Sequence, residues 1–439
     1  MRRAWIGLVA TVMALAIASA GWGAERTSLR IAVPEPWRIV KPLETNDRAS
    51  VVPNRLWFYE TVQSFRRQHP EITLRFEAVP FTAIESTFVT KAIAGDPPDI
   101  SMMPSAPPLK LARAGYLAPL DEFPFPWQDF KAEYRRDSMS VDGKLYLMPG
   151  HVPVLVLFYN KVLFAKAGLT RPPGTWDELV QMAKMLMRDT TGSGKPDVWG
   201  FGVPVGTTSF FAVYPRLEAL VWSAGGELHD RGRALIDTPA MRRAVKLYVD
   251  LVHTHKVMPE TSTTWDQLEY FTDWFTSGKL GMTMASAEFY RYPAVDRMGE
   301  ANVGIARLPL FSPGDPPATW VQTWGWVMSK QAAATKKEAA WSFLKQLGSE
   351  ETYVLAAQYQ RGLPPRTSLG GHPIYRSSPE LEFQAKYVVE AGRPDPPIEE
   401  WQFYVDLMSR TVQAAVLRIR PVPDLLRDAQ REYDARVKR

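Results

Sequence analysis

The order of strand-like and helix-like segments between residues 29 and 103 constrains the fold more than any other feature of the sequence. Residues 29–33 (LRIAV) and the alternating apolar side chains of residues 72–78 predict two strands. Apolar residues at helical spacing predict helices over 56–65 and 84–93, and a third short strand follows in PDISMM. Strands that alternate with helices usually lie parallel in one sheet that the helices cover. An α/β fold is therefore predicted.

The stretch AIAGDPPDISMM, residues 92–103, places a rigid corner in front of that third strand. Pro97 and Pro98 disfavour helical backbone at the residues before them, so the preceding helix must end by Gly95. The strand then carries Met102 and Met103 to its carboxyl end, the edge where open α/β sheets bind ligands. Methionines at such a position more often fill a core, and this alternative stays open.

A second unit begins near residue 143. Val154 to Tyr159 is long and apolar enough for a buried strand, and Thr175 and Glu178 have the spacing of a capping box in front of a helix. Because a chain of 439 residues exceeds what one ordinary core holds, two domains are expected.

The first residues have the layout of a cleavable export signal. Two arginines precede an apolar run of about 15 residues, which is short of the roughly 20 that a membrane-spanning helix needs, and small residues follow it. Cleavage is expected between Ala20 and Ala24. A twin-arginine signal at Arg2 and Arg3 is the alternative, although the rest of that motif is missing. The chain has no cysteine, which excludes a lipid anchor and disulfides, so a freely diffusing periplasmic protein is predicted.

Charge and composition favour a soluble protein without nucleic-acid partners. The chain has 46% hydrophobic and 23% charged residues, which is ordinary for a globular protein. Its formal net charge of +5 falls to +3 when the signal leaves with Arg2 and Arg3. The basic residues are scattered, whereas nucleic-acid binding needs a concentrated basic face.

Motifs for catalysis or cofactors are incomplete. TTGSGKP (190–196) lacks the first glycine and the hydroxyl residue of a phosphate-binding loop. The segment Asp189 to Asp197 is at most a degraded calcium loop, because Thr191 and Ser193 replace carboxylates. His253 and His255 more often belong to a solvated surface than to a metal site. We therefore predict no catalytic residue, no metal site and no cofactor.

The aromatic content points to a different kind of function. The chain has 15 tryptophans, and 12% of its residues are aromatic. Several of these side chains, including Trp37, Trp320 and Trp324, lie in predicted loops or at strand ends. Flat apolar faces with polar edges suit ligands such as sugar rings.

Five blocks in register resemble one protein family. The blocks are FVTKAIAGDPPDISMM with LARAGYLAPLDEF, the stretch from GKLYLMPGHVP to QMAKML, LVWSAGGELHD, FTSGKLGMTMASAEFY, and VGIARLPL through GLPPRTSL. Together they are similar to the extracellular solute-binding proteins of carbohydrate ABC importers, the maltose-binding-protein-like type. The resemblance covers essentially the whole mature chain. It implies a type II periplasmic-binding-protein fold, in which two α/β lobes, each a helix-covered mixed sheet, close on a ligand by a hinge motion.

The resemblance also implies boundaries and a hinge. Residues 1–24 are the signal peptide, residues 25–151 and 308–358 form the N-terminal lobe, and residues 152–307 and 359–439 form the C-terminal lobe. The expected hinge residues are His151, Pro153, Val154, Leu308 and Pro309.

Candidate ligand-binding residues come from this resemblance and from the aromatic pattern. They are Trp37, Met103, Ser105, Phe210, Phe211, Tyr214, Glu288, Phe289, Trp324, Arg366 and Trp401. Glu288 stands where relatives often place a stacking tryptophan. Pro153 and Ala106 stand where the family supplies carboxylates for sugar hydroxyls, so the identity of the ligand does not carry over.

The resulting hypothesis is a monomeric binding protein that captures a mono- or oligosaccharide or a polyol and delivers it to the inner-membrane permease subunits of an ABC importer. One alternative keeps the fold but binds a sugar phosphate or another anion, for which Arg366, Lys144 or Arg291 would matter. A second is a secreted carbohydrate-active enzyme that uses a pair of carboxylates.

Overall fold

A computed structural model describes residues 26–80, 83–131, 140–207, 211–265, 270–376 and 378–438, with the side chains of Ala106 and Pro107 left out. The predicted signal peptide and the candidate ligand residue Phe210 lie outside these ranges.

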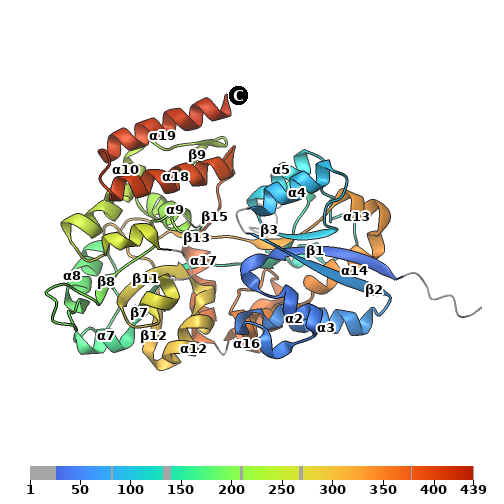
Figure 1. Cartoon of the computed structure of the whole chain (residues 1–439), viewed down its shortest axis with the longest axis horizontal. Coiled ribbons are helices and arrows are strands. Elements are labelled where there is room, and N and C mark those ends of the chain that lie inside the picture. The colour runs from blue at the N-terminus through green and yellow to red at the C-terminus, as the bar shows by residue number, and fades with distance from the viewer. Residues whose placement is uncertain are drawn as a thin grey trace, which may run out of the picture.

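Two lobes, each built on its own sheet, make up the molecule (Figure 1). The first sheet has the strand order β2 (Ile72–Val79), β1 (Thr27–Pro34), β3 (Ile100–Pro104), β14 (Trp324–Met328) and β6 (Met148–His151). The second has the order β12 (Val303–Ala306), β7 (Leu155–Asn160), β11 (Leu280–Ser286) and β8 (Trp199–Phe201). Short strand pairs complete the set: β13 (Thr319–Val321) with β15 (Gly392–Pro394), β9 (His229–Asp230) with β10 (Arg233–Ala234), and β4 (Ser140–Val141) with β5 (Lys144–Leu145).

The first sheet confirms the α/β prediction. Strand β1 pairs in parallel with both β2 and β3. Strand β14, more than 200 residues further along the chain, inserts antiparallel between β3 and β6. Both sheets are therefore mixed, because β7 also pairs antiparallel with β11 and β12 while β11 runs parallel to β8.

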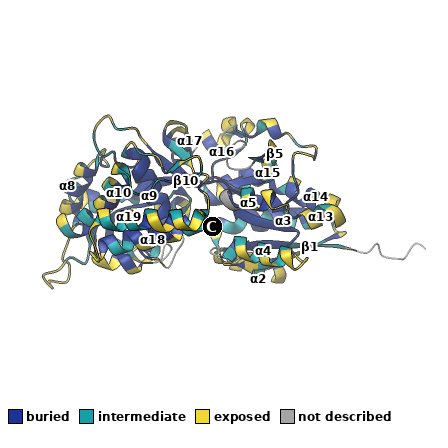
Figure 2. Cartoon of the chain, turned by 90° about the horizontal axis from the view of Figure 1, so that it is seen from above, coloured by how far each residue is buried: buried dark blue, intermediate teal, exposed yellow. Residues whose placement is uncertain are grey.

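Helices cover both sheets, with buried faces turned inward and exposed faces turned outward (Figure 2). Around the first sheet lie α2 (Val40–Thr45), α3 (Leu56–Gln68), α4 (Ile84–Ile93), α5 (Ala106–Arg113), α13 (Lys330–Thr335), α14 (Lys337–Leu347), α15 (Glu350–Gln360) and α16 (Pro373–Arg376). Around the second lie α7 (Lys161–Lys166), α8 (Trp176–Leu186), α9 (Tyr214–Ser223), α10 (Pro239–Val249), α12 (Asp296–Met298), α18 (Trp401–Val416) and α19 (Val422–Val437). Helix α17 (Pro379–Ala391) lies where the lobes meet (Figure 1).

The corner before β3 forms as predicted. Helix α4 ends at Ile93, and Gly95 takes the left-handed conformation, with φ of 75°, that glycine adopts without strain. The Asp99 carboxylate accepts hydrogen bonds from the Arg30 backbone N–H and the Lys336 ammonium, both at 2.8 Å. The corner is thus tied to β1 and to the segment between α13 and α14. Ile93 is 71% exposed, because the helix ends there and its side chain lies off the buried face.

The start of α8 shows a variant of the predicted capping box. The Thr175 side chain accepts the Glu178 backbone N–H at 3.2 Å, as expected for an N-cap. The Glu178 carboxylate reaches back one residue further than the motif requires and accepts the Gly174 N–H at 2.7 Å. It also pairs with Arg171 at 2.9 Å. These contacts lower the pKa of Glu178 to about 2, with the Arg171 hydrogen bond as the largest cause.

The chain crosses between the lobes in neighbouring segments. The first crossing connects β6 to β7, and Val152 in it forms a bridge with Leu363, while Val154 forms one with Val321. Residues 308–321 pack on the second lobe, since Leu310 pairs with Thr175 and Trp320 belongs to the second core. The second crossing therefore falls between β13 and β14, later than the predicted position at Leu308 and Pro309.

After the second crossing, the chain returns from the first lobe to the second lobe at a point later than the predicted boundary at residue 358. Segment 366–376 still packs on the first lobe, because the Tyr375 hydroxyl donates to the Tyr353 carbonyl at 3.1 Å. The Thr367 N–H likewise donates to the Asp129 carbonyl at 2.6 Å. Helix α17 then carries the chain across.

Candidate functional site

A cavity of about 640 Å³ lies between the two lobes at the crossing segments. Its walls come from residues of the first lobe, of the second lobe and of both crossings: Glu35, Pro36, Trp37, Arg38, Val52, Asn54, Arg55, His151, Pro153, Leu155, Phe211, Pro215, Arg216, Ser286, Glu288, Phe289, Tyr292, Pro293, Trp320 and Trp324. A space of this size is within the range of small-molecule binding sites.

The first-lobe wall is built from two short 3-10 turns, η1 (Glu35–Trp37) and η3 (Pro53–Arg55). The Trp37 ring packs edge-on against Trp57, with ring centroids 5.8 Å apart, and this contact fixes its position. The Arg55 guanidinium lies over the Trp37 ring, 4.6 Å from its centroid. This wall thus offers an indole and a cation side by side.

The second-lobe wall starts where β11 ends. The Ser286 hydroxyl accepts the backbone N–H of Glu288 at 3.4 Å and caps the turn η9 (Ala287–Phe289). Phe289 packs against Phe271, with ring centroids 5.0 Å apart, and Phe211 packs at a tilt against Trp324, with ring centroids 6.0 Å apart. Aromatic faces therefore meet the cavity from both lobes, with small polar groups between them.

The side chains of His151, Glu288 and Gln360, from three different segments, meet beside the cavity, and we call them the hinge cluster. The His151 Nε2 lies 3.0 Å from Glu288 Oε1, and the Gln360 side-chain amide donates to the same carboxylate. His151 is in the first crossing, and its ring lies parallel to that of Trp324 in the second crossing, 6.3 Å away. Gln360 ends α15, immediately before the segment that bridges Val152.

The electrostatics of the hinge cluster keep Glu288 ionised. Burial acts to raise the pKa of this carboxyl group, but the charge and hydrogen bond of His151, the charge of Arg55 and the Gln360 amide together outweigh it. The pKa of Glu288 therefore lies below its ordinary value. Burial lowers the pKa of Arg55 to about 10, against the opposing charge of Glu288.

A second group of buried acids, the rear cluster of Asp395 and Glu218, lies behind the cavity wall. Asp395 accepts the Trp320 Nε1–H at 2.6 Å and a hydrogen bond from the Gln322 amide. Both carboxylate oxygens of Glu218 are buried without a hydrogen-bond partner in the described part of the chain. Burial raises the pKa of Asp395 to about 7 and raises that of Glu218 strongly, with the charge of Asp395 adding to the effect on Glu218.

Five of the candidate ligand residues line the cavity: Trp37, Phe211, Glu288, Phe289 and Trp324. Among the expected hinge residues, His151 and Pro153 also line it, and Val154 is fully buried beside them. Leu308 and Pro309 precede the actual second crossing, and the Leu308 N–H donates to the Tyr387 hydroxyl at 3.0 Å.

Five other candidates are placed away from the cavity wall. Met103 is 0% exposed, because β3 is an inner strand of its sheet, paired on one side with β1 and on the other with β14. Ser105, between β3 and α5, is 1% exposed. Tyr214 and Trp401 pack edge-on against each other at 5.4 Å in the second core. The Arg366 guanidinium instead pairs with Asp129 at 2.6 Å and ties the segment after Leu363 to the first lobe.

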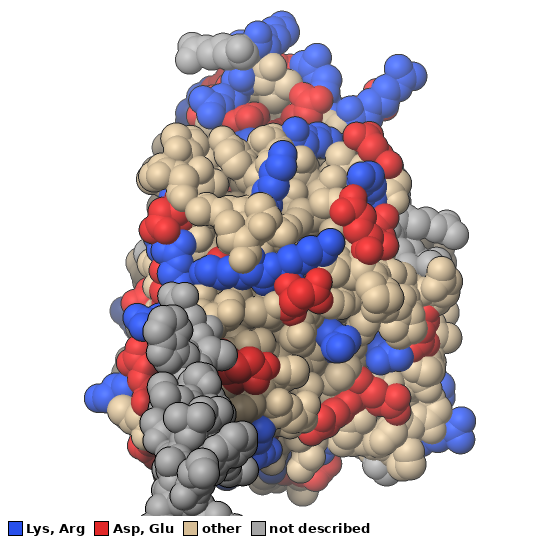
Figure 3. Space-filling view, turned by 90° about the vertical axis from the view of Figure 1, so that its right-hand side faces the viewer, with Lys and Arg blue, Asp and Glu red and all other residues tan. Residues whose placement is uncertain are grey.

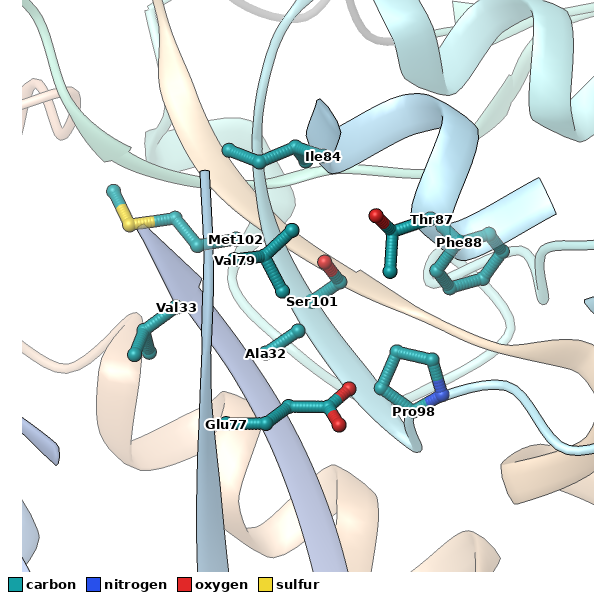
Figure 4. A pocket seen from close by; sticks show the side chains of 10 residues that line it. All are labelled: Ala32, Val33, Glu77, Val79, Ile84, Thr87, Phe88, Pro98, Ser101 and Met102. Atoms are coloured by element: carbon teal, nitrogen blue, oxygen red, sulfur yellow. The ribbon is translucent and has the colours of Figure 1, made fainter. Parts of the chain in front are cut away.

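The neighbourhood of β3 also holds a small internal space of about 10 Å³ (Figure 4). The side chains of Ser101, Met102, Phe88 and Pro98 line it from β3, α4 and the corner. This volume is close to that of one water probe, so the space cannot receive a solute. The carboxyl half of β3 therefore faces the interior of its own lobe.

Sequence reasoning did not identify Asn54, Arg55, Arg216 or Tyr292 as cavity residues. Arg55 follows a loop that has no counterpart in the family resemblance, and its contact with Trp37 is not visible as a motif. Arg216 comes from the first turn of α9, where a buried arginine looks in the sequence like an ordinary helical surface residue.

The loop from Asp189 to Asp197 closes on its own backbone. The Asp189 carboxylate accepts the N–H groups of Gly192 at 2.8 Å and Gly194 at 2.6 Å, and Asp197 accepts that of Thr190 at 2.6 Å. Among the residues that the structure describes, no group of three or more His, Asp or Glu side chains has the arrangement of a metal site.

The end face of the first lobe carries Lys and Arg side chains interspersed with Asp and Glu (Figure 3).

Within the described ranges, none of the helices combines the length and the apolar character needed to cross a bilayer.

Comparison with known proteins places the chain in a family. The family of bacterial extracellular solute-binding proteins matches residues 50–354, which is more than half of the chain, and the chain belongs to this family. It is similar to a binding protein of Brucella abortus, with 27% identity over 87% of this chain and 90% of the relative. An arabinooligosaccharide-binding protein of Halalkalibacterium halodurans is 23% identical over 73% of this chain and 70% of its own length.

A solved structure extends the likeness to the fold. Maltose-bound T. maritima MalE3 superposes with a TM-score of 0.79 at 24% identity, over 93% of this chain and 99% of that one. The two-lobe fold expected from the sequence is therefore confirmed.

Proposed function

We propose that this protein is the substrate-binding component of an ABC importer and that it captures a sugar, an oligosaccharide or a polyol between its lobes. One observation carries the proposal: the cavity between the lobes is walled by aromatic faces from both sides, with hydrogen-bonding groups at their edges. Sugar rings have apolar faces and hydroxylated rims and are complementary to such walls.

The ligand contacts that we propose are those of the cavity wall. Phe211, Phe289 and Trp324 supply the flat faces, Trp37 supports Arg55 from beneath, and Asn54, Arg55 and Ser286 supply hydrogen bonds. Met103, Ser105, Tyr214, Arg366 and Trp401 are not included, because their side chains pack or pair away from the cavity. The names of the relatives, which include an arabinooligosaccharide-binding protein and a maltose-bound structure, support a carbohydrate ligand.

Capture works by rotation of the lobes about the neighbouring crossings at 152–154 and 321–324, with helix α17 as the third connection. The hinge cluster lies on this axis, so the ligand and the Glu288 carboxylate share the cavity floor. A ligand that contacts both lobes favours the closed arrangement, since it gains contacts there that the open arrangement lacks.

The remaining steps follow from the proposed role. After removal of residues 1–24 the protein acts as a monomer in the periplasm, does not alter its ligand, and presents the closed lobes to the inner-membrane permease subunits. It needs no cofactor.

Thermal denaturation of the mature protein across a panel of sugars, sugar oligomers, polyols and sugar phosphates tests the proposal. A ligand present at 100 times its dissociation constant should raise the free energy of unfolding by about 2.7 kcal/mol. Phe211→Ala should weaken binding about tenfold, because the substitution removes one aromatic wall. Phe403→Ala, a half-buried phenylalanine on α18 beside Arg436, serves as the matched control and should bind normally.

Two outcomes would contradict the proposal. If no member of the panel raises the unfolding temperature, a carbohydrate-binding role fails. If the protein converts a glycan into products, and this turnover is lost in Glu288→Gln, the protein is a carbohydrate-active enzyme.

A further inference from the structure

Three arginines line the cavity, Arg38, Arg55 and Arg216, and the last two do so in contrasting ways. The Arg216 side chain is buried, and each of its nitrogens donates a hydrogen bond. The acceptors are the carbonyls of Phe211 and Ala212 at 2.9 and 2.8 Å, the Met284 carbonyl at 3.0 and 2.7 Å, and the Tyr270 hydroxyl at 2.7 Å. The protein thus satisfies this cation completely, and Arg216 has a structural role.

Arg55 has no comparable set of acceptors. Its Nη1 is buried, and within the described residues no hydrogen-bond partner or ion pair is found for the group. The guanidinium lies over the Trp37 ring, with its Cζ 4.6 Å from the ring centroid. Within the described residues no ion pair joins Arg55 to the nearby carboxylate of Glu288, whose Oε1 already accepts hydrogen bonds from His151 at 3.0 Å and from Gln360.

An unsatisfied guanidinium at this place is costly, and the cost grows as the lobes close. Burial already disfavours the charged form, which shows as the lowered pKa of Arg55. A sugar hydroxyl can accept one hydrogen bond but carries no charge. A carboxylate supplies both the acceptors and the opposite charge, and guanidinium–carboxylate pairs are the strongest of such contacts.

We infer that the ligand is an acidic sugar, such as a uronic acid or an oligosaccharide that contains one, and that its carboxylate pairs with Arg55 at the first-lobe wall of the cavity. This inference rests on the proposed function and narrows its ligand class. A single negative charge fits the site better than a phosphate dianion, because Glu288 lies close enough to act on Arg55.

Isothermal titration with matched ligands tests the inference. D-glucuronate is compared with D-glucuronamide, D-galacturonate with D-galacturonamide, and digalacturonate with its diamide, so that the members of each pair differ chiefly in charge. At least one acid should bind ten times more tightly than its amide, and added salt should reduce the difference. Arg55→Gln should abolish the preference, whereas Arg75→Gln, on the exposed side of the outer strand β2, should keep it.

Each other outcome overturns the inference in a recognisable way. If acids and amides bind equally, or neutral sugars bind and acids do not, the acidic ligand is wrong while the proposed function stands. If glucose 6-phosphate or galacturonate 1-phosphate binds best, the ligand is a phosphate ester. If Arg55→Gln still prefers the acid over its amide, the ligand carboxylate pairs with a residue other than Arg55. If no carbohydrate of either kind binds, the proposed function fails as well. The wild-type pairs decide the ligand class even if the variant does not fold.

Discussion

The hinge cluster and the rear cluster hold buried carboxyl groups on opposite sides of the same cavity wall, yet their acidities shift in opposite directions. Glu288 has His151 in contact and Arg55 nearby, and its pKa is lowered. Among the described residues Asp395 has neutral donors alone, from Trp320 and Gln322, and burial raises its pKa to about 7. Neither oxygen of Glu218 has a hydrogen-bond partner in the described chain, and the pKa of Glu218 is raised like that of Asp395.

The difference teaches that burial alone does not set the charge of an acid. A cation within reach converts a buried carboxyl group into a permanent anion, whereas neutral hydrogen bonds leave it ready to take a proton. The anion lies at the pivot between the lobes. The proton-binding pair lies inside one lobe, where it links the cavity wall at Trp320 to strand β15 without adding charge below neutral pH.

The largest effect is expected from Asp395→Asn. Because the pKa of Asp395 rises from 3.8 in the unfolded chain to about 7 in the fold, the protonated group stabilises the protein fully below pH 4, and this contribution is lost as the pH rises through 7. The free energy of unfolding should fall by about 4 kcal/mol over this pH range in the wild type, and Asp395→Asn should not show this fall. Urea denaturation at pH 5 to 8 measures the slope. Asp230→Asn, at an exposed site, should keep the wild-type slope, and an unchanged slope in Asp395→Asn would contradict the assignment.

His151→Leu should cost about 3 kcal/mol at neutral pH, because it leaves the Glu288 anion buried without its closest partner. The sign of the pH dependence is opposite to that of Asp395. Glu288 has a lowered pKa, so its ion pair contributes stability above pH 4.5 that is lost as the pH falls. The gap between variant and wild type, measured by urea denaturation, should therefore narrow in acid.

The matched control for the hinge cluster is His255→Leu, a half-buried histidine near the end of the helical segment that follows α10. This control should differ from wild type by less than about 0.5 kcal/mol. If the difference in free energy of unfolding between His151→Leu and wild type does not change with pH, the ionised form of Glu288 is not stabilised by this histidine.

The smallest effect is expected from Trp320→Phe, which removes one neutral donor from Asp395. The loss should be about 1.5 kcal/mol at pH 8, where Asp395 is ionised and its hydrogen bond is strong, and smaller at pH 5. Trp199→Phe, at a half-buried site on the edge strand β8, controls for the change of ring. Equal losses at both pH values would show that the indole acts through packing only.

Much of the fold follows from local pattern. The period of the apolar residues places β1, β2, β3 and their helices, and the proline corner places the end of α4. The insertion of β14 beside β3 depends on contacts more than 200 residues apart, and no local pattern reports them. That insertion is the physical reason why Met103 is enclosed.

Site residues could be predicted from the sequence where they stand at the end of a helix or strand. They could not be predicted where their role depends on a contact with a side chain distant in the sequence. Phe289 and Glu288 follow β11 directly, and Trp37 follows β1 after a short turn. The role of Arg55 depends on the Trp37 ring beside it and on its Nη1, which has no hydrogen-bond partner among the described residues. Tyr214 and Trp401 are aromatic residues at helix starts, a position that suits a cavity wall and a core equally well.

The parallel stacking of Trp324 on His151 has an optical consequence. Trp37, Trp320 and Trp324 are the tryptophans among the cavity-lining residues, and one of them lies against an imidazole at the pivot. The emission of an indole responds to the water and the ring systems around it. A ligand that displaces water from these faces, or a rotation that separates the two stacked rings, should therefore change the intrinsic fluorescence, so that the protein reports its own occupancy without an added dye.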